Sequence, residues 1–284
     1  MKQQIIDLWK VSFGDSDEFI QLYFDRVYKE ENTLVIKKDG RVVSALQILP
    51  YEMTYFRAMI PVGYICGVCT APSERGKGLM NQLMIKALEE MRGRGYALAV
   101  LIPATPGLFD LYRRFGFENV FDYGLEEVTC EKHLRGTQMT RIGRIGADHQ
   151  KIFAYYRLKQ CEREYCVLHS EEQFETIRQD WMLGRGEIWV ALEDEQPVGL
   201  AFSILRNKDT VSIREIMYEN ADVKNTLVQF VLNHYQLSNA ILRIPPTPTN
   251  FIPYGMARVI DLEMMNELLL KYEQRQAYMN LMLD

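Results

Sequence analysis

The sequence predicts an α/β protein built on a mixed (α+β) sheet, with two domains that repeat one order of elements and a C-terminal helical tail. Three observations predict this class. Asp39-Gly40 lies between two β-branched runs, which indicates a hairpin. A strand, a glycine-rich turn and an amphipathic helix follow one another between residues 59 and 91. The same order recurs in part between residues 189 and 232, and 284 residues exceed one average domain.

The composition is that of an ordinary globular chain, with 48% hydrophobic and 25% charged residues. The formal net charge of −5 gives no global basic field, so nucleic acid is not an expected partner. The N-terminus lacks the apolar core and cleavage site of a signal peptide, and no apolar run approaches the ~18 residues of a membrane span. We therefore expect a cytoplasmic protein without a membrane partner.

The cysteines and histidines do not predict a metal site. Five cysteines are an odd number, poorly suited to a disulfide framework. Cys66 and Cys69 form a C-x-x-C, but they lie in an expected strand, where residues three apart point to opposite faces. We interpret them as small buried hydrophobes. The remaining cysteines are Cys130, Cys161 and Cys166, and the scattered histidines are His133, His149, His169 and His234.

The first elements are two helical pieces and a hairpin. Apolar residues recur at helical spacing from residue 5 to 29, with Gly14-Asp15-Ser16 as a break and a new N-cap. The hairpin strands run over 33–36 and 42–49, the second continuing through 51–56. Residues 59–70 make a further strand.

The next segment contains the best specified helix. Ala71–Gly78 forms a turn, and the stripe Leu79, Leu83, Met84, Ala87, Leu88 and Met91 predicts an amphipathic helix that ends at Gly93 or Gly95. Residues 97–102 are wholly apolar, which favours a strand buried on both faces beside a parallel neighbour. A short helix near 109–114 and a strand near 124–130 follow.

The second half repeats this order after a polar, glycine-punctuated linker at 134–150. A hairpin at 189–205 and a strand–turn–helix at 211–232 match the first half. The second turn contains no glycine and no basic residue, so it keeps the architecture without the chemistry of the first. The predicted domains are 1–133, a degenerate copy at 134–250, and a helical tail at 251–284.

Arg75-Gly76-Lys77-Gly78 has the features of an anion site. The first turn of a helix leaves backbone N–H groups without partners, and the helix dipole adds positive potential there. Glycines allow close approach of a phosphate, and Arg75 and Lys77 add charge. The spacing is neither that of a Walker loop nor that of a dinucleotide fingerprint. The alternative is a solvated basic turn.

Two motifs resemble those of the GNAT acetyltransferases. Arg75-Gly76-Lys77-Gly78-Leu79-Met80 is similar to their R-x-x-G-x-[G/A] pyrophosphate loop, and Leu111–Phe117 is similar to their Y-x-x-x-G-F segment. Met80 stands where most members have a small residue, a departure shared by the Eis-like branch, which also has a second, degenerate GNAT-like domain. The resemblance covers about residues 5–250 and implies a GNAT fold followed by a degenerate GNAT-like domain.

The resemblance implies an N-acetyltransferase that moves an acetyl group from acetyl-CoA to a primary amine by direct attack, without a metal. Backbone groups of Val68 and Thr70 would pair with the pantetheine arm, and residues 76–81 would hold the pyrophosphate. Tyr112 would protonate the leaving thiolate, although packing beside Phe115 and Phe117 is its alternative role. The implied cofactor-binding residues are Val68, Cys69, Thr70, Arg75, Gly76, Lys77, Gly78, Leu79, Met80, Asn81, Ala104 and Thr105, with Pro103 beside them.

The chemistry is consistent with this reading, but a base for the amine is harder to identify. An oxyanion could be held by a backbone N–H near Val68 or Cys69. In the Eis-like branch the terminal carboxylate arrives from a sterol-carrier-like third domain. Residues 256–261 resemble the start of that domain, but the chain ends at Asp284, so the domain is truncated or the chain is a fragment. Glu52 could substitute, with a solvated strand carboxylate as the alternative.

Two functional alternatives stay open at this point, and so does the identity of the acceptor. The chain could be a non-catalytic acyl-CoA-binding or sensor protein that kept the loop and lost turnover. Residues 134–250 could be a partner-binding module that borrows the fold. The acceptor is not readable, so aminoglycosides, polyamines, peptide amines and small metabolites all remain candidates, and homo-oligomerisation is equally open.

Overall fold

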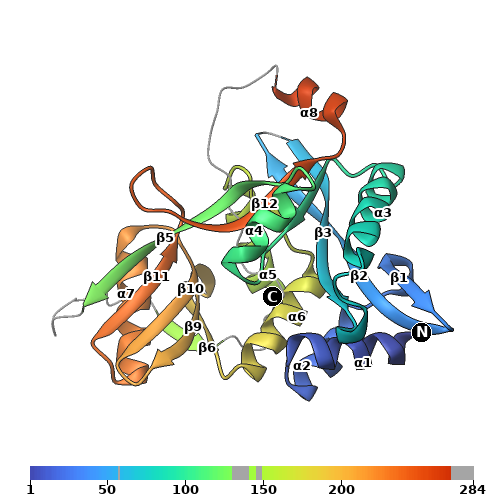
Figure 1. The fold of residues 1–284 in the computed structure, drawn as a ribbon. Helices are drawn as coiled ribbons and strands as arrows, with labels where there is room; N and C mark the ends of the chain where they lie inside the picture. Colours follow the sequence, from blue (N-terminus) through green and yellow to red (C-terminus); the bar gives the residue numbers. More distant parts are fainter. Residues whose placement is uncertain (57, 130–140, 145–148, 270–284) are drawn as a thin grey trace. The chain divides into compact units, whose positions relative to one another are not determined.

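The computed structural model describes residues 1–56, 58–129, 141–144 and 149–269, and Figure 1 traces their fold. The chain divides into two compact units. The first comprises Met1–Phe121 and the described residues from Tyr254 onward, and the second comprises Asp122–Pro253. Most of the predicted linker, the strand end at Cys130, and the end of the predicted tail lie outside the described residues.

Two helices open the first unit, as the sequence predicts. Helix α1 (Lys2–Phe13) ends at Gly14, whose φ of 73° is left-handed, and α2 (Asp17–Arg26) begins at Ser16. The Ser16 hydroxyl accepts a hydrogen bond from the Phe19 N–H at 3.2 Å. A 3-10 turn, η1 (Glu30–Asn32), leads into the sheet.

The sheet of the first unit has the order β1-β2-β3-β4-β12. Strands β1 (Thr33–Lys38) and β2 (Arg41–Tyr55) form the predicted hairpin, whose two turn residues have φ values of 50° and 77°. Strand β3 (Ala58–Thr70) pairs antiparallel with β2, and β4 (Leu98–Leu101) pairs parallel with β3. The parallel neighbour expected beside the apolar strand is confirmed.

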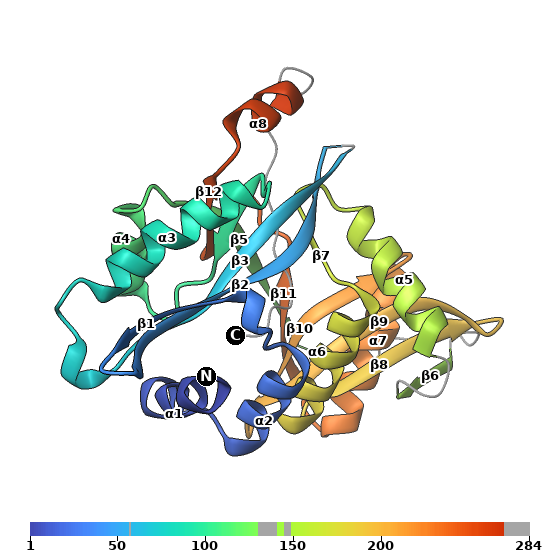
Figure 2. The same ribbon diagram turned by 90° about the vertical axis from the view of Figure 1, so that its right-hand side faces the viewer.

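Helices cover both faces of this sheet. Figure 2 shows α3 (Leu79–Gly93) on one face of the β1–β3 strands and α1 with α2 on the other. Leu83, Met84 and Met91 of α3 pack in the core of the first face, as their stripe predicts. Trp9, Tyr23 and Phe24 fill the core of the opposite face. A 3-10 turn, η2 (Pro72–Glu74), precedes α3, and α4 (Pro106–Arg113) follows β4.

The fifth strand of this sheet comes from the far end of the chain. Strand β12 (Ile252–Val259) pairs antiparallel with β4, with Met256 opposite Leu101 and Val259 opposite Leu98. Helix α8 (Leu262–Leu269) follows it. The prediction that 251–284 is a helical tail is therefore wrong for its first part. Likewise, residues 256–259, read as the start of a third domain, belong to the first unit because a non-local strand pairing recruits them.

The second unit repeats the topology around its own core. Its sheet has the order β5-β11-β10-β9-β8-β6, and the hairpin β8–β9 turns at Asp194 and Glu195, both left-handed. The strands are β5 (Glu118–Thr129), β6 (Arg141–Arg144), β7 (Val167–Leu168), β8 (Glu187–Glu193), β9 (Gln196–Asn207), β10 (Thr210–Tyr218) and β11 (Asn239–Ile244). The helices are α5 (His149–Cys161), α6 (Glu171–Leu183) and α7 (Ala221–Tyr235).

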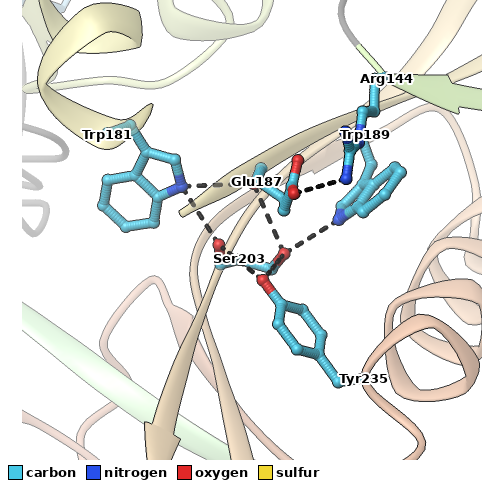
Figure 3. Close-up of polar contacts among 6 residues, drawn as sticks. All are labelled: Arg144, Trp181, Glu187, Trp189, Ser203 and Tyr235. Atoms are coloured by element: carbon cyan, nitrogen blue, oxygen red, sulfur yellow. Dashed lines mark hydrogen bonds and ion pairs between the residues drawn. The ribbon is translucent and has the colours of Figure 1, made fainter. Parts of the chain in front are cut away.

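A buried serine ties the hairpin of the second unit to two of its helices (Figure 3). The hydroxyl of Ser203 accepts a hydrogen bond from Trp189 Nε1 at 2.9 Å and lies 3.5 Å from the hydroxyl of Tyr235. Trp181 Nε1 donates to the carbonyls of Glu187 and Ser203, both at 3.2 Å. Each of these polar atoms has a hydrogen-bond partner within the unit, as buried polar groups usually do.

A β-bulge in β3 corrects the expected orientation of the two strand cysteines. Ala45 pairs with Cys69 and Gln47 with Cys66, so Gly67 and Val68 together face Leu46 alone. Gly67 has a φ of 59°, the left-handed conformation of a glycine bulge. Because of the extra residue, the side chains of Cys66 and Cys69 point to the same face of the sheet, and both contact the α1–α2 core. The prediction of opposite faces is therefore wrong, because it assumed regular alternation.

Substituting Gly67 should reveal how tightly this bulge is packed. A Cβ at Gly67 would lie 2.6 Å from the Trp9 ring, whereas a Cβ at Gly40, which is also left-handed, meets no atom of the described chain within 4 Å. We expect Gly40→Ala to cost about 1 kcal/mol of unfolding free energy from backbone strain. Gly67→Ala should cost about 1–3 kcal/mol more through overpacking. Urea unfolding of both variants measures this, and equal losses would contradict the packing of Trp9 on the bulge.

Candidate functional site

Strand β3 has an accessible stretch in the middle of the sheet. In the described ranges, β4 pairs with Val62, Gly63 and Tyr64 of β3, and β3 then continues to Thr70. Beyond the last pair, Cys66, Gly67 and Val68 are partly exposed, although β3 is an inner strand. Backbone groups that lack a neighbouring strand can pair with an extended ligand. This stretch is therefore a candidate binding edge.

The bulge determines the face of the sheet on which the side chain of each predicted site residue of β3 lies. Val68 packs against the core beside α3, whereas the Cys69 side chain is buried in the α1–α2 core. The Thr70 hydroxyl lies 2.8 Å from that of Ser44. The residue Cys69 is only 5% exposed, so its thiol is not available to a ligand.

The turn after β3 leaves the start of α3 accessible. Gly76 and Gly78 have φ values of 75° and 76°, and a Cβ at either position would meet no described atom within 4 Å. Gly78 is the N-cap, and no described side chain caps the helix. The N–H groups of Leu79, Met80 and Asn81 are thus not engaged by a capping side chain. By contrast, Ser16, Ser170 and Asn220 cap α2, α6 and α7.

Basic side chains surround this helix start. Lys77 and Lys38 contact the Glu74 carboxylate at 3.1 and 3.2 Å, and these hydrogen bonds, that of Lys77 first, lower the pKa of Glu74. Arg75 Nε donates to the Thr70 carbonyl at 3.1 Å, at the end of β3. Lys38 was missed by the sequence reasoning, since the β1–β2 hairpin brings it here from far along the chain. Three cations and one carboxylate leave the turn net positive.

Tyr112 lies at the end of α4, packed in the same core as the α3 stripe. Its ring meets that of Phe117 edge-on, with centroids 6.1 Å apart, and the residue is 7% exposed. Burial, and secondarily the nearby Cys66 thiol, raises the pKa of Tyr112 to about 12. The phenol therefore keeps its proton at neutral pH and can donate it. This position of Tyr112 is compatible with both of its predicted roles, packing in the core and donating a proton.

A group of uncharged side chains surrounds Cys66. The Tyr23 hydroxyl lies 3.2 Å from the Cys66 thiol and donates to Gln47 Oε1 at 3.1 Å. Burial raises the pKa of the Cys66 thiol to about 12 and also raises that of Tyr51. These groups are neutral at physiological pH. Tyr23 and Gln47 gave no sequence signal, because the α2–β2 packing that unites them is tertiary.

The other predicted residues separate into two groups. Ala104 and Thr105 are exposed in the short connection from β4 to α4, and Thr105 is the N-cap of α4. Glu52 is exposed on β2, which pairs regularly with β3 from Gln47 onward. Strand alternation therefore puts Glu52 on the face opposite Gln47 and Cys66. The structure does not bring Glu52 to the Cys66 group.

In the part of the second unit that the structure describes, each of these openings is absent. Glu219 and Asn220 alone connect β10 to α7, whereas Ala71–Gly78 connects β3 to α3. The Asn220 side chain accepts from the Val223 N–H at 3.0 Å and occupies the helix start. Strand β10 bulges before Glu215, which is 1% exposed and pairs with Arg163 at 2.8 Å. An internal ion pair thus fills the region that is accessible in the first unit.

Comparison with protein families identifies the first unit. Residues 2–120 match the family model described as an acetyltransferase (GNAT) domain. These residues form a GNAT acetyltransferase domain. The chain is accordingly an acyltransferase through this domain, and the fold expected from the two sequence motifs is confirmed. A sequence search of curated proteins gives no match.

Solved structures resemble the chain along most of its length. A probable N-acyltransferase from Enterococcus faecalis superposes with a TM-score of 0.75 at 18% identity, over 93% of this chain and 71% of that one. Eis1 from Mycobacterium abscessus gives 0.70 at 13%, over 92% and 72%. N-myristoyltransferase from Saccharomyces cerevisiae with myristoyl-CoA gives 0.53 at 10%, over 90% and 79%. At these identities the likeness shows a shared fold, in which a GNAT domain precedes a GNAT-like region.

Among the described residues, no three or more His, Cys, Asp or Glu side chains gather as metal ligands would. No helix among them has the length and apolarity needed to cross a membrane.

Thiol labelling should report the environment of Cys66. Its pKa of about 12 means roughly a thousandfold fewer thiolates than a thiol with the ordinary value of 9.0 has at pH 8. We expect iodoacetamide to label the exposed Cys161 at least tenfold faster than Cys66, as measured by peptide mass spectrometry. Labelling of Cys66 should quicken as pH rises toward 12. Equal rates at pH 8 in the folded protein, with equal rates in urea as the reference, would contradict this environment.

Proposed function

We propose that this chain is an acetyl-CoA-dependent N-acetyltransferase, which moves the acetyl group to a primary amine by direct attack. The observation that carries the proposal is the conjunction, in one unit, of an uncapped glycine start of α3 with an accessible stretch of β3. The second unit, with the same topology, has its helix start capped and its strand region filled. The GNAT domain is therefore proposed as the catalytic one and the second unit as a degenerate copy.

The helix start supplies a site for the pyrophosphate of CoA. Backbone N–H groups at the opening of α3 point along the helix axis, and the dipole favours an anion there. The absence of a Cβ at Gly76 and Gly78 lets phosphate oxygens approach the main chain. Lys38, Arg75 and Lys77 supply charge around it.

The accessible stretch of β3 supplies a site for the pantetheine arm. An arm carrying amide groups can pair with Val68 and Thr70 as an added strand does. The thioester then lies near the bulge at Gly67 and Val68. A bulge leaves ladder groups unpaired, so an N–H there can stabilise the oxyanion that forms when an amine attacks.

Tyr112 supplies the proton that the leaving group needs. The amine nitrogen bonds to the thioester carbon, the C–S bond breaks, and the sulfur takes the Tyr112 proton to leave as the free thiol of CoA. The proton released by the amine nitrogen replaces, by way of solvent, the proton that Tyr112 gave to the sulfur, so the phenol is neutral again and charge balances. The raised pKa keeps Tyr112 protonated at every pH at which the protein would be assayed.

A second function deserves a test because of the groups around Cys66. These groups are neutral, and Glu52 is not among them, so the described part of this site shows no base for the amine. This observation favours a protein that binds acyl-CoA without turnover. Release of free thiol from acetyl-CoA in the presence of an amine separates the enzyme from the binder. A cytoplasmic location and a small-molecule or peptide amine as acceptor belong to the first proposal.

Reversing the charge of the turn should weaken CoA binding. We expect Arg75→Glu with Lys77→Glu to lower the affinity for CoA more than tenfold in calorimetry, because each lost charge-assisted hydrogen bond is worth about 1.5–3 kcal/mol. Lys86→Glu with Arg92→Glu is the matched control. It changes net charge equally at exposed positions further along α3, and it should alter affinity less than threefold. Equal effects of the two pairs would contradict the site.

Removing the Tyr112 hydroxyl should slow transfer without weakening binding. Tyr112→Phe keeps the ring that packs on Phe117, so the affinity for CoA should stay within twofold. The rate of thiol release should fall about 10²-fold through loss of the proton donor. In the native protein, activity should show no decline from deprotonation of Tyr112 below about pH 11, because its pKa is about 12. An unchanged rate in the variant would remove Tyr112 from the mechanism.

A further inference from the structure

The recruited strand β12 presents a charged residue to an apolar core. Met256 and Ile260 are buried in the core that also holds Tyr112 and Phe117. Arg258 lies between them at the spacing of two that keeps side chains on one face. A guanidinium on such a face needs hydrogen-bond partners, since burying an unpaired charge is costly.

The partner of Arg258 is the turn that ends α4. Its Nη1 donates to the carbonyl of Phe115, and its Cδ, Nε and Cζ would each lie 3.7 Å from a Cβ at Gly116. Gly116 is left-handed, with a φ of 75°. In the described residues no carboxylate pairs with Arg258. The side chain therefore lies over the turn and holds it through a main-chain carbonyl.

This turn also fixes the backbone of Tyr112. The N–H groups of Phe115 and Phe117 both donate to the Tyr112 carbonyl, at 2.9 and 3.3 Å. Phe115 thus bonds Tyr112 through its N–H and Arg258 through its carbonyl. The Phe117 ring, at the other end of the turn, supports the Tyr112 ring. One continuous set of contacts runs from β12 to the phenol.

We propose that Arg258 is a positioning residue, which holds the α4 turn so that the Tyr112 hydroxyl meets the leaving sulfur. The proposal rests on the proposed function of Tyr112 as proton donor. Arg258 acts by geometry, because burial and Cys66 are the causes of the raised pKa of Tyr112 and Arg258 is not among them. Displacement of a catalytic group by ~1 Å is enough to slow a reaction by as much as about 10²-fold.

A double-mutant cycle tests this role. Thiol release from acetyl-CoA would be measured with a panel of primary amines for the native protein, Arg258→Met, Tyr112→Phe and the double variant. We expect Arg258→Met to lower kcat about tenfold, with KM for acetyl-CoA changed less than twofold. In the Tyr112→Phe background the same change should alter kcat less than twofold, because coupled residues are not additive. Arg258→Lys, which keeps one donor, should recover part of the rate.

Hydrogen exchange gives a readout that does not depend on activity. The amides of residues 115–117 should exchange faster in Arg258→Met than in the native protein, because the turn loses its clamp. Arg214→Met is the matched control, an exposed strand arginine of the second unit, and should change neither exchange at 115–117 nor kcat. Thermal unfolding of each variant confirms that it is folded.

The outcomes distinguish the two proposals. An equal loss of kcat from Arg258→Met in both backgrounds, or an effect on KM alone, would overturn the positioning role in an active enzyme. A native protein that binds CoA and releases no thiol with any amine would overturn the proposed function instead. In that case the exchange measurement decides whether Arg258 holds the turn, and unchanged exchange would overturn this contact as well.

Discussion

The described site depends on one constraint, which is that β3 must lose its parallel partner while remaining inside a sheet. Backbone N–H and C=O groups need hydrogen bonds, so a strand parts from its neighbour only where something else replaces the pairing. Here the parting follows Tyr64, and the glycine bulge at Gly67 comes just after it. The Trp9 ring packs on Gly67 from the face of the sheet that α1 and α2 cover. These two helices therefore support the accessible stretch of β3.

The two units show how little is needed to make or remove such a site. Both place a bulged third strand before a helix in the same topology. In the first unit the connection is long, basic and rich in glycine, and the helix start is uncapped. In the second unit a short connection, a capping asparagine and a buried ion pair fill the same positions. The shared fold does not distinguish the two units. They differ in whether side chains occupy the helix start and the strand region beside it.

Local signals in the sequence were sufficient for the hairpins, the helix break at Gly14 and the glycine turn before α3. Each depends on residues adjacent in the chain, and Asp39-Gly40 is an example, since its turn demands left-handed backbone. The bulge was missed because Gly67 resembles any other strand glycine until Trp9 is placed against it. Lys38, Tyr23 and Gln47 were missed because tertiary packing brings them to the site. Strand β12 was missed because its pairing with β4 joins distant parts of the chain.

The late arrival of β12 has a consequence for biosynthesis. Residues 98–101 leave the ribosome long before residues 252–259, so during translation β4 is a bare strand edge in a nascent domain. Unpaired edges invite association with other chains, and pairings across such sequence distances form slowly. The GNAT domain can complete its own sheet only after the whole second unit has been synthesised. A gene fragment encoding residues 1–121 alone would therefore yield an aggregation-prone domain, although it contains every residue proposed for catalysis.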